Sequence, residues 1–359
     1  MNFRDISLLI DMLIGLLENA IHLSFKSHVK KVTNTINSVL AMYDNDRATK
    51  YIELEQLKLE IKRLNTEHYK AIQDSIERYK VLSYIHTKTP SEFLLSQMTG
   101  DDVKSSIGNY DELLKHLDSE VEEYKLSTIA NNHINKLTDE LSGVVASNVL
   151  NDIDNKQTLQ AVEHTLDKYK RHAQNLANLE TGKAQSQANI DIEEENKEKY
   201  KLRKIWISQR DKRVRETHII LDATEADKDG LFHSKLTQTK GYAPRMMKGA
   251  LAMRENAGCR CSIGYRVNGI ELQQMDKKHM SKEHQALYER TKFDRYQMWL
   301  DKVSENIHPA YYEQLSKGID WDRKQTLKKK RNTVRDDATK FKEMLENGYH
   351  KKPDGSWGY

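Results

Sequence analysis

Proline is almost absent from the middle of this chain, and this most constrains how the chain can fold. The sequence has four prolines, at Pro90, Pro244, Pro309 and Pro353. Glycine is sparse before Gly230 and denser after it. Because proline and glycine are the strongest interrupters of regular structure, the first two-thirds of the chain is predicted to be helical. The last third is predicted to be mixed.

The clearest predicted helix covers about residues 48–85. Its apolar positions recur at steps of three and four residues, which places them on one face. They are Leu54, Leu57, Ile61, Leu64, His68, Ile72, Ile76 and Tyr79. One stripe cannot bury itself, so the apolar segment Ile6 to Met42 is the expected partner. Thr89-Pro90 is expected to end this pair, with Ser91 capping a short new helix.

Further elements follow from the same patterns. Helices are expected over about 111–150 and 156–200, with a possible break at Gly182. Beyond Trp206 the segment "THIILDA" has a strand-like pattern, and "SIGYRVNGIEL" has the alternation and Asn-Gly turn of a hairpin. Helices are expected again over about 281–306, after Pro309, and over 321–347, before a C-terminal tail.

The predicted fold is mainly α. It consists of an elongated helical bundle (residues 1–155), a small α+β module (156–270) and a C-terminal helical segment with a tail (271–359). Charged residues make up 31% of the chain and hydrophobic residues 37%, which suits long helices with narrow apolar stripes. The net charge of +4 does not by itself indicate nucleic-acid binding.

The chain is expected to be made in a reducing cytoplasm. Two cysteines give no disulfide framework, and the N-terminus lacks a basic leader with a small-residue cleavage site. The apolar run Ile6 to Leu17 contains Asp11 and is short for a membrane span. We therefore expect no stable membrane anchor, although an interfacial helix is a minor alternative.

Both cysteines, Cys259 and Cys261, lie about forty residues after His218. In an extended segment, residues two apart point to the same side. Three interpretations stay open. The favoured one is structural, with two small buried thiols and a hydrogen-bonded histidine. The second is a zinc site formed by His218, Cys259 and Cys261, which would need a fourth ligand. The third is a Cys-His nucleophile, for which no residue to orient the base is evident.

"SQRD" at Ser208 to Asp211 fits a helix-opening capping box. In the helix that it would open, Asp211, Arg215 and His218 would share one face.

These motifs together resemble the Mu F-like phage head morphogenesis family. The resemblance covers about residues 169–267 and is carried by "LANLETGKAQSQANI", "KIWISQRDKRVRETHIILDATEADKDGLF", Pro244 and "GCRCSIGYRV". Its signature includes Asp211, Arg213 and Arg215. The sequence departs from the family pattern in three places: Ala223 stands where a glycine is usual, Gly258 stands where an asparagine is usual, and the Thr/Glu pair is reversed, as Glu180-Thr181.

The resemblance implies a minor head protein of a tailed phage rather than an enzyme. It would lie inside the capsid near the portal and act in head morphogenesis and DNA packaging or ejection. The implied partners are the portal protein, the major capsid protein and packaged double-stranded DNA. No cofactor other than the possible zinc is expected. The alternative is an enzyme, effector or ejection protein packaged in the head and delivered with the DNA, although residues 268–359 show no recognisable catalytic motif.

A basic cluster near the C-terminus is the predicted contact to DNA phosphates or to the portal. It comprises Lys324, Lys328, Lys329, Lys330, Arg331 and Arg335. As a helix, four of these residues would form one stripe, able to hold phosphates without reading sequence. A second basic cluster is formed by Arg203, Lys204, Arg210, Lys212 and Arg213.

Overall fold

A computed structural model provides the structure of the protein. The residues that it describes are 2–41, 47–101, 103, 107–118, 122–151, 153–209, 213–267, 270–271, 294–316, 350–351 and 357–358. The chain forms two compact units, Met1–His308 and Pro309–Tyr359. In the second unit, residues 309–316 are helical, and β7 (His350–Lys351) pairs antiparallel with β8 (Trp357–Gly358), within the segment that was predicted to be a tail.

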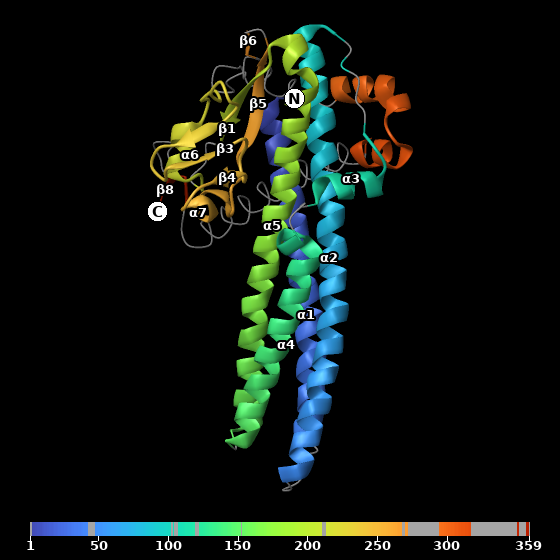
Figure 1. The fold of residues 1–359 in the computed structure, drawn as a ribbon, viewed down its shortest axis with the longest axis vertical. Coiled ribbons are helices and arrows are strands. Elements are labelled where there is room, and N and C mark those ends of the chain that lie inside the picture. The colour runs from blue at the N-terminus through green and yellow to red at the C-terminus, as the bar shows by residue number, and fades with distance from the viewer. Residues whose placement is uncertain are drawn as a thin grey trace. The chain divides into compact units, whose positions relative to one another are not determined.

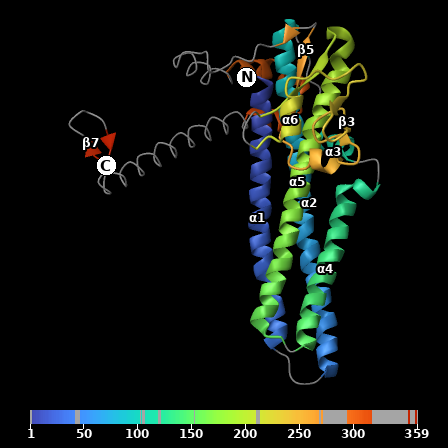
Figure 2. The same cartoon turned by 90° about the vertical axis from the view of Figure 1, so that its left-hand side faces the viewer.

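Four long helices of the first unit lie side by side (Figures 1 and 2). They are α1 (Phe3–Ala41), α2 (Arg47–Thr99), α4 (Leu126–Leu150) and α5 (Asn155–Tyr200). Helices α2 and α5 pack on each other, and α1 and α4 each pack on both. The predicted stripe of α2 faces this core, with only Leu54 and Tyr79 at its ends partly exposed. The mainly α fold with a helical bundle is confirmed, whereas the domain boundaries after residues 155 and 270 stay predictions.

Helix α2 does not end at Pro90, so the predicted break is wrong. Proline removes one helical hydrogen bond and crowds the preceding turn, at a cost of about 3 kcal/mol. Here the surrounding turns are buried almost all round, from Val81 to Ser96. In addition, Lys88 forms a buried ion pair with Glu92 at 3.1 Å, which spans the proline. Tertiary packing therefore overrides the local preference.

The single helix predicted over 111–150 is also wrong. The structure has α3 (Tyr110–Leu117), a 3-10 turn, η1 (Glu122–Tyr124), and then α4. Helix α3 opens with a complete capping box, in which the Asn109 side chain accepts from the Glu112 backbone N–H and the Glu112 carboxylate accepts from the Asn109 N–H. Asp118 is extended and ends the helix.

A small α+β module follows α5. Strand β1 (Arg203–Ile207) pairs antiparallel with β5 (Ser262–Val267), which pairs with β6 (Ile270–Glu271). A second antiparallel sheet contains β2 (Phe232–Ser234), β3 (Thr239–Gly241) and β4 (Met247–Lys248). Helices α6 (Glu216–Leu221) and α7 (Ala252–Asn256) complete it. The predicted hairpin is confirmed by the pairing of Val267 with Ile270.

A helix over residues 294–303 and the 3-10 turn η3 (Ser304–Asn306) close the first unit. Tyr296 and Trp299 pack their rings against Phe93 of α2, each at 5.6 Å between centroids. The described part of the helix predicted over 281–306 is therefore helical, and the helix predicted over 321–347 lies outside the described residues.

Helix α1 is long and apolar enough to cross a membrane when judged by length and composition alone. Its most apolar stretch of 18 residues has a mean hydropathy of 1.6, and 39% of that stretch is buried in the structure. The buried side chains, among them Ile10, Leu17 and Ile21, pack within the bundle.

A layer of buried histidines crosses the bundle. The rings of His28 in α1 and His68 in α2 are stacked with centroids 4.0 Å apart. Nε2 of His28 lies 2.9 Å from the Asn65 side-chain oxygen, and Asn65 donates in turn to Thr138 of α4. Burial lowers the pKa of His28 to about 4, and burial together with the His28 charge lowers that of His68 to about 2. Both rings are therefore neutral near pH 7.

This layer predicts an acid-sensitive bundle. The unfolded chain takes up protons on these histidines as the pH falls through about 6.5, whereas the folded chain resists protonation down to about pH 4 for His28. Stability is thus fully present above pH 6.5 and declines below it. The loss from His28 is on the order of 3 kcal/mol by pH 4, at about 1.4 kcal/mol per pKa unit. Melting curves between pH 7.5 and 5 should show a smaller decline for His28→Gln/His68→Gln than for the wild type. An equal decline, with exposed His22→Gln as the control, would refute this account.

Candidate metal centre

His218 lies in the short helix α6. The sequence predicts a helix that begins at Ser208 and a strand-like segment from Thr217, and the structure differs from both. No helix opens at Ser208, because Ser208 and Gln209 continue from β1 and the Ser208 N–H donates to the Asp222 carboxylate at 2.7 Å. The strand-like "IILD" instead falls largely in α6. Only His218 and Leu221 of α6 are buried, whereas Ile219 and Ile220 are exposed. One helical turn thus aims His218 inward.

The predicted shared face of Asp211, Arg215 and His218 is wrong for the two described residues. Arg215 is the extended residue that precedes α6. Its guanidinium donates to the carbonyls of Arg254, Glu255 and Ala257, the last two at 2.7 and 2.5 Å. Arg215 thus ties the start of α6 to the end of α7. Arg213 forms an ion pair with Asp11 of α1 at 3.6 Å, and Asp211 lies outside the described residues.

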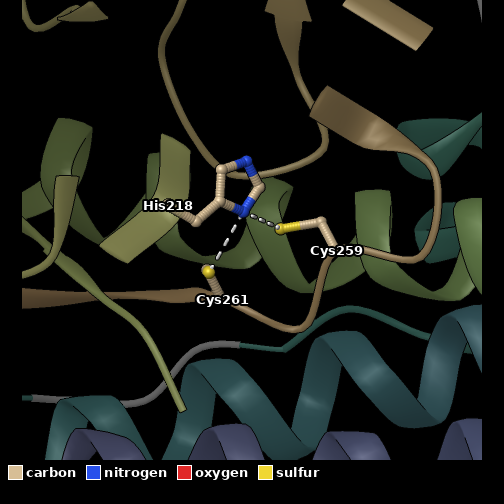
Figure 3. A group of neighbouring side chains, drawn as sticks. All are labelled: His218, Cys259 and Cys261. Atoms are coloured by element: carbon tan, nitrogen blue, oxygen red, sulfur yellow. Dashed lines mark hydrogen bonds between the residues drawn. The ribbon is translucent and has the colours of Figure 1, made fainter. Parts of the chain in front are cut away.

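The structure brings His218, Cys259 and Cys261 together (Figure 3). Nδ1 of His218 lies 3.5 Å from Sγ of Cys259 and 3.4 Å from Sγ of Cys261. The three residues are 2%, 1% and 2% exposed, respectively. The prediction that both thiols point to the same side is confirmed, since both sulfurs face one imidazole nitrogen.

These distances fit a zinc ion. Zinc binds thiolate at about 2.3 Å and imidazole at about 2.0–2.1 Å, and a tetrahedral angle then separates nitrogen from sulfur by about 3.5 Å. The same separations suit N–H···S hydrogen bonds in the metal-free protein. Within the described residues, the group has three donors. A fourth position would be filled by water or by a further side chain.

Glu255 of α7 lies behind His218 and was not predicted. Its Oε2 is 2.7 Å from Nε2 of His218, and its carboxylate accepts from the hydroxyls of Thr217, Ser234 and Thr237. It is fully buried. Metal-binding histidines usually donate their second ring N–H to such a carboxylate, which fixes the tautomer and ring orientation. Glu255 and its hydroxyl partners come from separate elements of the module, so no local sequence pattern marks it.

The electrostatics of the two sulfurs are opposed. Burial opposes ionisation of Cys259, but contacts with Cys261 and His218 and the charge of Arg245 hold its pKa well below the ordinary thiol value. The neighbouring Cys259 and burial raise the pKa of Cys261. The pair thus holds one thiolate readily, and a divalent cation would stabilise the second.

A carboxylate, an imidazole and a thiol in series also resemble a nucleophilic triad. Glu255 supplies the orienting group that the sequence did not reveal. A nucleophile must reach its substrate, however, and both sulfurs are almost completely covered. Burial therefore favours a structural or metal-binding role.

The predicted basic clusters have a different outcome. Lys204 is buried and forms an ion pair with Glu193 at 2.7 Å, and exposed Arg203 pairs with Glu225 at 2.7 Å. Arg210 and Lys212 lie outside the described residues, as do all six members of the C-terminal cluster (Lys324, Lys328, Lys329, Lys330, Arg331 and Arg335). With Arg213, which pairs with Asp11, three cations of the second cluster are thus engaged within the fold.

Residues 139–264 match the family described as Phage Mu protein F like protein. The chain carries a Mu F-like region. The match begins within α4, ends within β5 and contains all of α5, His218 and both cysteines. It confirms the predicted resemblance.

Two of the departures from the family pattern, Ala223 and Gly258, lie at left-handed backbone positions. Ala223 has a φ of 62° and Gly258 also has a φ of 62°. Glycine and asparagine adopt this region most readily. At residue 258 the exchange of asparagine for glycine keeps the turn favourable, whereas Ala223 holds its turn at some steric cost.

The chain is also similar to NAD(+)--arginine ADP-ribosyltransferase EFV of Enterococcus faecalis. The two are 28% identical over 221 residues, which cover 60% of this chain and 42% of the relative. The chain thus matches less than half of that relative's length. No solved structure gives a significant match.

The geometry predicts about one zinc ion per chain, lost when a thiolate is lost. Cys259→Ser and Cys261→Ser should each reduce zinc content to a small fraction of the wild-type value, because hydroxyls are poor zinc ligands. Elemental analysis of protein purified under reducing, chelator-free conditions measures this. His233→Gln, which changes an exposed histidine of the same module, should retain its zinc. Zinc-free wild-type protein would favour the purely structural interpretation.

Glu255→Gln is expected to weaken zinc affinity by about 10- to 100-fold, since the amide no longer holds the His218 Nε2–H as a charged acceptor. Competition with a chromophoric chelator gives this ratio. Unchanged affinity in a folded variant would show that Glu255 does not orient the ligand.

Proposed function

We propose that this protein is a minor structural protein of a tailed-phage head, held at the portal on the inner side of the capsid. It would act in head morphogenesis and in DNA packaging or ejection. The Mu F-like match supports the head assignment. The long bundle, with α2 alone 53 residues or about 80 Å in length, offers an extended surface for neighbouring subunits.

The burial of the candidate centre is the observation that carries a structural rather than a catalytic role. His218, Cys259 and Cys261 are covered by the module that they connect. A zinc ion held there would join α6 to the segment entering β5 and contribute directly to folding, as structural zinc sites do. The portal, the major capsid protein and packaged DNA are the proposed partners, with the C-terminal basic cluster as the proposed phosphate contact.

A packaged effector is the second candidate. It is favoured by the similarity to a relative named as an arginine ADP-ribosyltransferase. If this chain shared that activity, the purified protein would release nicotinamide from NAD⁺ and modify arginine-containing acceptors. Absence of both reactions would leave the structural role.

The structural proposal is tested in the phage that encodes the chain. The wild-type chain should be present in purified virions and should co-purify with the portal protein when the two are co-expressed. Cys259→Ser/Cys261→Ser should reduce its incorporation several-fold, because an unclosed module presents the wrong surface, whereas His233→Gln should be incorporated normally. A chain that is made during infection but absent from virions would contradict the proposal.

A further inference from the structure

Arg245 is a buried cation without a carboxylate partner. It is 2% exposed, and its hydrogen bonds among the described residues go to an amide oxygen and a backbone carbonyl rather than to a carboxylate. Nη1 donates to the Gln185 side-chain oxygen of α5 at 2.7 Å and contacts the carbonyl oxygen of Cys261 at 3.4 Å. A buried charge needs compensation. The nearby negative groups that act on Arg245 most strongly are the two cysteines.

The path of the Arg245 side chain requires a glycine in α5. A Cβ placed on Gly182 would lie 2.0 Å from both Cδ and Nε of Arg245 and 2.5 Å from Cζ. Glycine is unfavourable in the middle of a helix, and a break was predicted here as possible. Helix α5 nevertheless continues through Gly182. The glycine lets the Arg245 side chain approach the helix backbone closely.

Neighbouring contacts hold the same two segments together. Ser186, one turn after Gly182, donates its hydroxyl to the carbonyl of Pro244. Gln185 donates to the Ser262 hydroxyl at 3.3 Å, directly after Cys261. One face of α5 therefore fixes both the turn that carries Arg245 and the segment that carries Cys261 into β5.

We propose that Arg245 is a positioning residue of the metal centre and that Gly182 of α5 is the part of the bundle that admits it. This rests on the proposed zinc site. A zinc ion with two thiolates and a neutral imidazole has no net charge. Arg245 lies close enough to both sulfurs for their negative charge to favour its cationic form. The guanidinium also fixes the Cys261 backbone against Gln185, so the ligand geometry depends on the bundle.

A double-mutant cycle on the full-length protein tests this inference. Zinc affinity is measured by chelator competition, and the Co²⁺ spectrum of each variant reports the thiolate ligands. Arg245→Ala should weaken zinc binding by about 10-fold or more, the range found for residues that support metal ligands. Gly182→Ala should have a similar effect, because the added methyl group displaces the guanidinium. The double variant should bind no more weakly than Arg245→Ala, since the added Cβ then meets no side chain. The zinc affinity of Arg245→Lys should lie between those of the wild type and Arg245→Ala. Lysine keeps the positive charge but cannot contact Gln185 and the Cys261 carbonyl with a planar guanidinium.

Gly143→Ala is the matched control, since Gly143 lies inside α4 and a Cβ there has no neighbour within 4 Å. Its zinc affinity should equal that of the wild type. Wild-type affinity in folded Arg245→Ala, or additive losses in the double variant, would overturn the role of Arg245 while leaving the zinc site intact. Failure of the wild type itself to bind zinc or Co²⁺ would overturn both proposals.

Discussion

Helix α5 packs into the bundle core with apolar side chains in its first half and against the α+β module with polar and small side chains in its second half. The arrangement of the first unit depends on this change along one helix. Its first half packs apolar side chains such as Val162, Leu166 and Ala173 into the bundle core. Its second half buries polar and small residues, among them Gln185, Ser186 and Asn189, against the module. Tyr265 of β5 donates to the Asn189 carbonyl at 2.6 Å. Each such buried polar group costs about 1–3 kcal/mol if left unpaired, so the module has one favourable position on the helix.

Much of the bundle could be predicted because its information is local. Apolar spacing placed α1, α2 and α5, and the alternation before Asn268-Gly269 predicted the β5–β6 hairpin. The errors occurred where tertiary contacts override local preference. Pro90 lies in a buried helix spanned by the Lys88–Glu92 ion pair, and Gly182 is kept helical beneath Arg245.

Only the ligand residues of the candidate site could be predicted from the sequence, because the residues that support them are brought together by tertiary contacts. His218 and the Cys-x-Cys pair stand out by residue type, and the structure joins them. Glu255 and Arg245 carry no sequence signal of that kind, because ordinary glutamates and arginines are frequent in this chain and their burial depends on loops that meet only in the fold. The helix expected from Ser208 does not form at that residue, because the Ser208 N–H donates to the Asp222 carboxylate from another part of the module.

The charges around the centre explain why such polar groups are tolerated in a small module. Glu255 accepts from three hydroxyls and lies against His218, and the two cysteines are the negative groups that act most strongly on Arg245. Partly paired buried charges would destabilise the fold. A divalent ion between the two sulfurs would complete the set in a site that is covered from solvent. This closed arrangement suits a part of an assembly better than a site of turnover.

X-ray absorption at the zinc edge of the purified full-length protein tests the account most directly. The account predicts one zinc environment with two sulfur neighbours at about 2.3 Å and nitrogen or oxygen neighbours at about 2.0–2.1 Å. A shell of light atoms without sulfur, or wild-type protein without zinc, would contradict it.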